Sequence, residues 1–521
     1  MRLLIFHGYL LRGTGSNVYN ALLATALARQ GHEVHLLCQE RRPQDLDAVG
    51  AAGDWDEHGM LRVRAIRAGR RVTTYRPDLG GVLPVYVADA YDGVQARTFA
   101  ELDDAAVAEY VARNVAAVRE VAERVAPDLA LANHLVMGPL ILARALEDRV
   151  PYAVKIHGSA LEYTVKPEPE RFLPAAREGL ARARTVLVGS RHTAESLWTA
   201  LDDPALPART RLGPPGVDVE LFRPEAGAGL GALTARLAAA AAQEVAAVAV
   251  PAASAFTRDA GEAARALASL DVDHDRHVAF VGKLIVSKGV DLLALAWPLV
   301  LAAEPRARLV VVGFGAYRDG LERLVAGLAA GDLGAVRDLV AAGRAAEGGP
   351  AGALRYAMAF LDELERAADR DAYLVAARDL PGRVVLTGRL EHDELAPLLA
   401  HCEAQVVPST FPEAFGMVAV EGAACGALPI VADHSGLGEV RAILAAEVPA
   451  AVAPWLGFDR GPHAVRDLAG RLTAWLAAPE EVRAAARAAL VATARARFSW
   501  DGVARGVVAA ARGEHAALPA P

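Results

Sequence analysis

The chain has 521 residues, of which 53% are hydrophobic and 23% are charged. This apolar content excludes a mainly disordered protein, and the length predicts about two to four domains. The formal net charge of -8 argues against a nucleic-acid binder built on an overall basic surface. The only lysines are Lys155, Lys166, Lys283 and Lys288. This bias toward Arg, together with abundant Gly, Pro and Ala, is typical of a GC-rich bacterial genome.

The three cysteines indicate a reducing compartment, because Cys38, Cys402 and Cys425 show neither a disulfide framework nor metal-ligand spacing. Residues 1–10 read as a buried strand rather than as a signal peptide. The sequence contains no run of 18 apolar residues that would predict a membrane span. We therefore expect a cytoplasmic protein without a metal site, and peripheral contact with the inner membrane face stays open.

Apolar runs alternate with helical patterns in the first part of the chain. Helices are expected at 18–30 and 105–126, between strands expected at 3–6, 33–38, 129–132, 153–156 and 185–188. This alternation predicts a parallel α/β sheet. A Pro/Gly-rich linker at 213–224 follows, so we assign residues 1–213 to a first Rossmann-like domain.

A second alternating half predicts a second domain over residues 214–497. Its buried parallel strands are expected at 278–281, 308–312, 384–386, 404–407 and 428–431. Two such halves predict doubly wound domains that face each other across a cleft. Helical insertions are expected near 226–275 and 317–381, where they would cover the cleft, mediate self-association or elaborate the surface. Segment 498–521 would form a last helix that packs back on the first domain, and the oligomeric state stays open.

The strongest chemical signal is segment 411–422, which carries two carboxylates, Glu413 and Glu421. A helix is expected to begin near Gly416, and its free backbone N–H groups would favour a bound phosphate. Carboxylates in a loop and on a helix suit different hydroxyl groups of one ligand, because each oxygen accepts a hydrogen bond. The alternative is a helix-start charge at Glu413 and a solvated helix face at Glu421.

Lys283 and Lys288 bracket a short loop after the strand expected at 278–281. Two ammonium groups there would neutralise a diphosphate leaving group. Solvated loop lysines are the alternative, although half of the lysines of the chain fall within this loop. The G-x4-G-K-[ST] spacing of a P-loop is absent.

Two loops and one basic segment of the first half are also candidates. The loop Gly13-Thr14-Gly15-Ser16 allows close approach of a ligand or forms a simple tight turn, and it lacks the third glycine of a dinucleotide fingerprint. His157 ends a strand where α/β sheets present ligand residues, with a structural role as the alternative. The arginines of residues 61–77 favour an exposed hairpin over a surface for an anionic acceptor or an acidic membrane.

Taken in order, these motifs resemble the retaining family-4 glycosyltransferases of GT-B fold over most of the chain. The resemblance rests on the glycine loop, the pair His157-Gly158, the run Pro215-Gly216-Val217-Asp218, segment 282–289, the runs Val312-Gly313-Phe314-Gly315 and Thr387-Gly388-Arg389-Leu390, and most specifically Glu413-x7-Glu421. Two features depart from the family pattern. Lys283 stands where an arginine is usual, and the two insertions are larger than the usual connections.

The resemblance implies a role for each matched residue. Lys283 and Lys288 would bind the donor diphosphate, and Glu421 would hold the ribose hydroxyls. His157, Glu413 and Lys288 would act on the transferred sugar and the leaving group. Asn17 would contact the acceptor, and further donor contacts would come from Gly15, Arg389, Leu390, Phe415, Gly416, Met417 and Val418.

The resemblance therefore implies transfer of a hexose from a UDP-, GDP- or ADP-sugar to a hydroxyl group, with retained anomeric configuration and no required cofactor. The acceptor would be a carbohydrate, a glycolipid or a small molecule, and it would bind the first domain. Alternatives are a nucleotide-sugar epimerase or a phosphorylase on the same fold, and a non-catalytic nucleotide-sugar-binding subunit.

Overall fold

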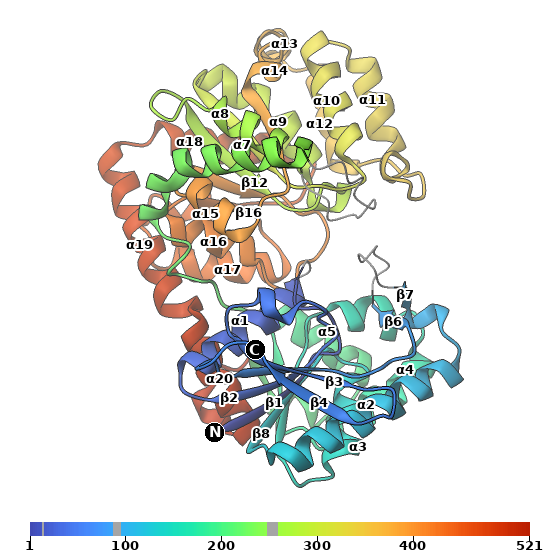
Figure 1. Ribbon diagram of the computed structural model, residues 1–521. Helices are drawn as coiled ribbons and strands as arrows, with labels where there is room; N and C mark the ends of the chain where they lie inside the picture. Colours follow the sequence, from blue (N-terminus) through green and yellow to red (C-terminus); the bar gives the residue numbers. More distant parts are fainter. Residues whose placement is uncertain (13–14, 87–94, 247–258) are drawn as a thin grey trace. The chain divides into compact units, whose positions relative to one another are not determined.

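A computed structural model describes residues 1–12, 15–86, 95–246 and 259–521 (Figure 1). The chain forms two compact units: unit 1 is Met1–Gly216 with Ser499–Pro521, and unit 2 is Val217–Phe498. Two residues of the predicted glycine loop, 13 and 14, and residues 247–258 of the first predicted insertion lie outside the described part. In the described part, no helix combines the length and the apolar character needed to cross a membrane.

Unit 1 is built on a mostly parallel sheet with the strand order β11-β10-β9-β8-β1-β2-β5-β3-β4. The strands are β1 (Arg2–Phe6), β2 (Glu33–Leu37), β3 (Val49–Trp55), β4 (Leu61–Ala65), β5 (Val72–Arg76), β8 (Leu129–Asn133), β9 (Tyr152–Lys155), β10 (Thr185–Val188) and β11 (Thr210–Leu212), with β6 (Val82–Val85) and β7 (Gln95–Thr98) as a separate pair. Leu4 and Phe6 enter one hydrophobic core, whereas Leu3 and Ile5 enter another. Both faces are therefore covered, which explains the continuous apolar runs.

Helices cover the two faces of this sheet. They are α1 (Gly15–Arg29), α2 (Asp104–Val125), α3 (Gly138–Leu146), α4 (Pro169–Ala181), α5 (Arg191–Leu201), α6 (Leu206–Arg209) and α20 (Trp500–Arg512). Helices α1 and α20 contribute to the core that holds Leu3, and α2, α3 and α4 contribute to the core that holds Leu4. Trp500 of α20 is 3% exposed, so the end of the chain completes the unit in which the chain begins.

The arginine-rich segment does not form the single exposed hairpin predicted for residues 61–77. Strand β4 is an exposed edge strand that pairs antiparallel with β3, but β5 lies inside the sheet between β2 and β3. Val72 and Tyr75 of β5 are each 2% exposed, because β-branched and aromatic residues fit a buried strand. The arginines at the ends of these strands form ion pairs, such as Arg76 with Asp54 at 2.8 Å.

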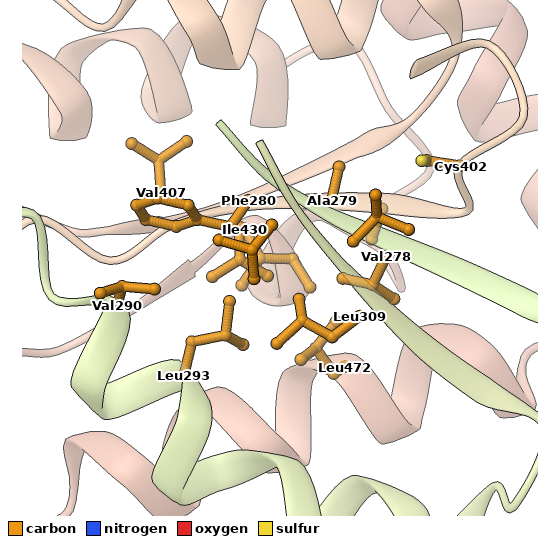
Figure 2. Close-up of a cluster of buried hydrophobic side chains, with 14 of the residues drawn as sticks. Val278, Ala279, Phe280, Val290, Leu293, Leu309, Cys402, Val407, Ile430 and Leu472 are labelled. Carbon is orange, nitrogen blue, oxygen red and sulfur yellow. The ribbon is translucent and has the colours of Figure 1, made fainter. Parts of the chain in front are cut away.

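Unit 2 is built on a parallel sheet with the strand order β14-β13-β12-β15-β16-β17. The strands are β12 (Arg276–Val281), β13 (Ala307–Val312), β14 (Val384–Gly388), β15 (Ala404–Val407), β16 (Leu428–Ala432) and β17 (Gly457–Phe458). Figure 2 shows part of its core, where Leu293 of α9 and Leu472 of α18 join side chains of β12, β13 and β16. The predicted parallel strands of both halves are thus confirmed as Rossmann-like α/β sheets.

Helices surround this second sheet and also form the predicted insertions. They are α7 (Leu230–Ala246), α8 (Ala260–Ala268), α9 (Val290–Ala303), α10 (Arg318–Ala330), α11 (Leu333–Ala342), α12 (Arg355–Leu364), α13 (Arg370–Ala377), α14 (Leu380–Arg383), α15 (His392–Leu399), α16 (Met417–Cys425), α17 (Ser435–Ala445), α18 (Ala464–Ala477) and α19 (Glu480–Phe498). Helices α10 to α14 form the second insertion. Its buried Tyr373 donates a hydrogen bond to the Leu295 carbonyl of α9 at 3.0 Å, which fastens the insertion to the sheet domain.

Candidate functional site

The candidate site of unit 2 starts where β12 and β15 end. These strands are parallel neighbours, so the loops that follow them meet at one edge of the sheet. Thr410 N–H donates to the Ser287 carbonyl at 2.9 Å. Gly289 has a φ of +70°, and an added Cβ would lie 2.0 Å from the Pro408 carbonyl oxygen. Glycine at 289 therefore permits the close contact that locks the two loops together.

A cation and a carboxylate meet between these loops. Lys288 Nζ contacts Glu413 Oε1, and the Ser409 hydroxyl donates to the same oxygen at 2.7 Å. The backbone N–H of Glu413 donates to the Ser435 hydroxyl at 2.9 Å. Burial raises the pKa of Glu413, but Lys288 and Ser409 outweigh this effect and hold the pKa below its ordinary value. Glu413 is thus an anion that two side chains orient before any ligand binds.

Lys283 lies at the exposed start of the same loop. An added Cβ at Gly313 would lie 1.9 Å from the Gly282 carbonyl oxygen, so the loops after β12 and β13 are in backbone contact. Leu284 is completely buried, and its N–H donates to the Phe314 carbonyl at 2.7 Å. The loop backbone is therefore fixed on both sides of Lys283, which is itself an exposed residue.

The first turn of α16 supplies backbone donors beside Glu413. Gly416 precedes the helix with a φ of +137°, and an added Cβ there would lie 2.6 Å from Leu437 Cδ2. Within the described residues, no side chain caps this helix. Phe415 is buried, and Met417 and Val418 are half-buried. The start of α16 agrees with the helix start predicted near Gly416, and the N–H groups of this turn are free to hold an anionic group.

Glu421 is buried on α16 and faces a histidine that the sequence analysis did not single out. Glu421 is 4% exposed, and its Oε1 lies 3.4 Å from His392 Nε2. Burial lowers the pKa of His392, but the hydrogen bond and charge of Glu421 outweigh burial and raise it. The solvated helix face considered for Glu421 is thus wrong. One carboxylate oxygen of Glu421 is positioned by His392, which begins α15.

Arg389 and Leu390 follow β14 on the other side of β13. The guanidinium of Arg389 binds Glu391 Oε1 at 2.8 Å and lies 5.9 Å from the centre of the Phe314 ring. Leu390 packs against the core of unit 2. The two residues thus form a partly apolar surface at the carboxyl edge of the sheet, of the kind that takes a planar ring.

The remaining predicted residues lie in unit 1. Gly15 is the exposed first residue of α1, and nothing lies within 4 Å of a Cβ added to it. Asn17 is 1% exposed; its Oδ1 lies 3.0 Å from His7 Nε2, and its Nδ2 donates to the Arg12 carbonyl at 2.6 Å. The polar atoms of Asn17 are therefore bound to His7 and to the Arg12 backbone.

His157 is linked to the same region by a chain of buried amides. Its Nε2 lies 2.8 Å from Asn133 Oδ1, and Asn133 and Asn20 exchange hydrogen bonds at 2.8 and 3.2 Å. Asn20 Nδ2 lies 3.0 Å from Nδ1 of His7. Burial lowers the pKa of His157, with His134, Lys155 and His7 adding to the effect, so the ring is neutral. Because Asn133 Oδ1 accepts, Nε2 carries the hydrogen and Nδ1 is an acceptor.

His392, Ser409 and Ser435 orient predicted residues but were not themselves predicted from the sequence. Ser409 stands in the loop after β15, and Ser435 begins α17 shortly after β16, so their position after a strand is the signal that was available. No sequence pattern pairs His392 with Glu421, because β15 separates their helices. In the described residues, no group of three or more His, Cys, Asp or Glu side chains is arranged to hold a metal ion.

Two family models match the chain. Residues 13–221 match Glycosyltransferase Family 4, and residues 367–489 match Glycosyl transferases group 1. A D-inositol 3-phosphate glycosyltransferase from Segniliparus rotundus is 28% identical over 59% of this chain and 47% of its own length. A glycogen synthase from Mycobacterium tuberculosis is 35% identical over 25% of this chain and 30% of its own length. The chain thus spans less than half the length of these relatives.

Solved structures share the fold over nearly the whole chain. A sucrose-phosphate synthase from Thermosynechococcus elongatus has a TM-score of 0.55 at 19% identity and covers 99% of both chains. Anabaena HepE in complex with UDP and glucose has a TM-score of 0.52 at 17% identity and covers 98% of both chains. The chain therefore has the GT-B fold, and its two family matches indicate a glycosyltransferase.

Proposed function

We propose that this protein transfers a hexosyl group from a nucleotide diphosphate sugar to an acceptor hydroxyl, with retention of the anomeric configuration. The observation that carries the proposal is the convergence at one sheet edge of Lys283, the pair Lys288–Glu413, the uncapped start of α16, and the buried Glu421. Cations and backbone donors suit a diphosphate, and the two carboxylates suit hydroxyl groups on either side of it.

Each group has a proposed role. Lys283, Lys288 and the first turn of α16, with Phe415, Gly416, Met417 and Val418, bind the diphosphate. Glu421 holds the ribose hydroxyls, with the oxygen that His392 leaves available. Glu413 holds hydroxyls of the transferred sugar, and Arg389 and Leu390 contact the base.

Residues of unit 1 complete the proposed reaction. His157 presents a neutral ring whose Nδ1 accepts a hydrogen bond from the donor sugar. Gly15 contacts the diphosphate through its backbone, because a glycine has no side chain to hinder close approach of a ligand. Asn17 orients the Arg12 backbone and the His7 ring, and through them the acceptor.

The bond between the anomeric carbon and the diphosphate oxygen breaks, and a bond from that carbon to the acceptor oxygen forms. The acceptor proton passes to the departing diphosphate, on the same face of the sugar. Glu413 does not act as a nucleophile, because its pairing with Lys288 and Ser409 stabilises the carboxylate charge. The lysines stabilise the charge that develops on the leaving group, and removing one such donor would cost about 3–4 kcal/mol of activation free energy.

The donor is a UDP-, GDP- or ADP-sugar, and UDP-sugars are the first to test because HepE and a trehalose-6-phosphate enzyme of E. coli are solved with UDP or a UDP-sugar. The acceptor is a carbohydrate, a glycolipid or a small molecule, and no metal or other cofactor is required. We propose a cytoplasmic bacterial enzyme, which the three free, buried cysteines support. Contact with the inner membrane face would follow if the acceptor is a glycolipid.

Thermal unfolding in the presence of UDP-, GDP- and ADP-glucose tests the donor. A ligand at 100 times its dissociation constant should stabilise the protein by about 2.7 kcal/mol. Glu421→Ala should abolish the shift, whereas Glu365→Ala, on the surface of the second insertion, should leave it unchanged. Absence of a shift with every nucleotide sugar would contradict the proposal.

Turnover then separates transfer from its alternatives. We expect nucleotide release that depends on an acceptor. NMR of the product should show the same anomeric configuration as in the donor sugar. Formation of a sugar phosphate from the donor and inorganic phosphate would instead identify a phosphorylase.

A further inference from the structure

The second insertion reaches the loop that carries Lys283 and Lys288. This loop contains a single helical turn, Val286–Lys288, which begins at Val286 after the extended residue Ile285. Glu347 Oε2 accepts a hydrogen bond from Val286 N–H at 2.9 Å. The carboxylate therefore binds the first free donor of the turn, from a part of the chain 61 residues away.

Glu347 is held in a rigid setting. Its side chain is 8% exposed, and its second oxygen accepts a hydrogen bond from Arg344 Nε at 3.1 Å. The short helical segment Arg344–Glu347 follows Gly343, where an added Cβ would lie 1.8 Å from the Gly352 carbonyl oxygen. Leu354 N–H donates to the Val340 carbonyl at 3.0 Å and closes the connection between α11 and α12. Both carboxylate oxygens of Glu347 thus accept hydrogen bonds, and backbone contacts restrain the segment that carries this residue.

Two buried ionisable side chains, Asp291 and Tyr317, lie close to Glu347 beneath the lysine loop. Asp291 at the start of α9 is 2% exposed, and Tyr317 is completely buried. Burial raises the pKa of Asp291 to about 7, and the charge of Glu347 adds to this effect. Burial also raises the pKa of Tyr317, with Asp291 and Glu347 contributing. These effects show that Glu347 lies close to the buried side chains of Asp291 and Tyr317, beneath the loop that carries the two lysines.

The opposite side of the turn is bound by the loop after β15. Ser287 carbonyl accepts from Thr410 N–H, and Gly289 contacts Pro408. The turn therefore lies between the Glu413 loop on one side and Glu347 on the other. Leu284 anchors the loop before the turn, and Glu347 and the Glu413 loop hold the turn itself, and with it Lys288, from two sides.

We infer that Glu347 is a positioning residue for the diphosphate-binding lysines, and that the second insertion serves to hold the lysine loop in its binding conformation. This inference rests on the proposed function and assigns the insertion a part in it. Glu347 has no contact with the donor in this role; it acts through the backbone of Val286. A substitution at Glu347 should therefore disturb the lysine loop when it removes the hydrogen-bond acceptor, and not when it removes the charge alone.

Amide hydrogen exchange and UDP binding, measured on the full chain, test the inference. In Glu347→Ala, exchange in the peptide that covers residues 284–292 should accelerate about tenfold, and the Kd for UDP should rise about tenfold. Glu347→Gln should restore both values to within about twofold, because the amide oxygen still accepts from Val286. Arg337→Ala is the matched control: Arg337 pairs with Asp362 and Glu365 on the same insertion, and its loss should change neither value.

A second variant removes the donor instead of the acceptor. Val286→Pro fits the first position of the turn, since Ile285 before it has the extended angles φ −137° and ψ 150°. In that background, Glu347→Ala should raise the Kd for UDP no further. Full additivity, or equal acceleration of exchange in Arg337→Ala, would overturn the inference.

The two proposals fail in different ways. If the wild-type chain binds none of UDP, GDP and ADP, the proposed function fails, and the exchange data still decide whether Glu347 holds the loop. If exchange accelerates in Glu347→Ala but the Kd for UDP stays constant, the positioning role is wrong while the donor site stands.

Discussion

Lys288 Nζ contacts Glu413 Oε1. The side chain proposed to bind the diphosphate and the side chain proposed to bind the transferred sugar thus form an ion pair with each other when no ligand is bound. The side chains are 32% and 24% exposed, which leaves both open to a ligand. Binding of a diphosphate must therefore compete with Glu413 for the ammonium group. The pair keeps both side chains oriented and limits the affinity for phosphate alone.

The competition predicts effects of opposite sign for one substitution. Glu413→Gln should tighten binding of free UDP about fivefold, because the release of a partly exposed ion pair is worth about 1 kcal/mol. The same variant should weaken binding of the intact UDP-sugar, which loses a charged acceptor for its hydroxyls. Calorimetric titration with both ligands checks this, and tighter binding of both or of neither would contradict the competition.

The pair of His392 and Glu421 predicts a pH-dependent contribution to stability. The pKa of His392 is raised in the folded chain, so its ion pair stabilises the fold below the ordinary histidine pKa of 6.5 and is lost as the pH rises through the raised value. His392→Gln should therefore be less stable than wild type at pH 5.5 and nearly equal to it at pH 9.

Urea unfolding at the two pH values measures this difference. His58→Gln is a suitable control, since the side chain of His58 is 75% exposed and its Nε2 lies 3.7 Å from the exposed Glu57. A stability difference for His392→Gln that is the same at both pH values would show that the ion pair does not contribute.

Lys155 predicts an opposite pH trend in unit 1. It is 2% exposed, its Nζ donates to the Gly213 carbonyl at 2.5 Å and lies 5.5 Å from the centre of the Tyr19 ring, and burial lowers its pKa to about 7. The unfolded chain holds the proton up to about 10.5, so the stability of wild type rises between these values by at most about 1.4 kcal/mol per pH unit.

Lys155→Met should consequently be more stable than wild type at pH 6, with an advantage that shrinks toward pH 10. The matched variant Lys166→Met changes a side chain that is 40% exposed and pairs with Glu162, and it should show no such trend. If the stability difference between Lys155→Met and wild type is the same from pH 6 to pH 10, burial does not lower the pKa of Lys155 in the folded chain.

Lys283 tests whether a compact ammonium is needed where an arginine is usual. Its backbone is fixed by Leu284 and by the contact of Gly282 with Gly313. The backbone therefore cannot shift to bring a larger, planar guanidinium into the position that the ammonium group of Lys283 takes beside the phosphate oxygens. Lys283→Arg should lower kcat/KM about tenfold, as expected when one charged hydrogen bond is misplaced. Steady-state kinetics with the best donor measures it, and unchanged values would remove any special role for lysine at 283.

The fold was predictable because buried parallel strands read as apolar runs followed by helical patterns. Residues 404–407 form β15 with the predicted bounds, and β12 ends at Val281 as predicted but begins two residues earlier than predicted, at Arg276. The loops after them could be identified as a candidate site, but their contact could not, because the strand order that makes β12 and β15 neighbours is a property of the sheet. Residues 72–76 were misplaced because the many arginines around them obscured a short buried strand.

The polar side chains that orient the site residues could not be predicted from the sequence for a similar reason. His392 and Glu421 stand on different helices, and Glu347 meets Val286 across 61 residues of chain. The burial of Lys155 could not be expected from the sequence either, since lysine is almost never fully buried. Such groups are fixed by three-dimensional packing, and no local pattern in the sequence encodes them.

The return of α20 to unit 1 has a consequence for the order in which the chain matures. A ribosome delivers the sheet of unit 1 first and the helix that holds Trp500 last, after all of unit 2. Until then, the face of the sheet around Leu3 and Ile5 lacks one of its two covering helices. Unit 1 therefore cannot reach its final core before the whole chain has emerged, and a nascent chain cut short anywhere before Ser499 leaves apolar surface open to aggregation.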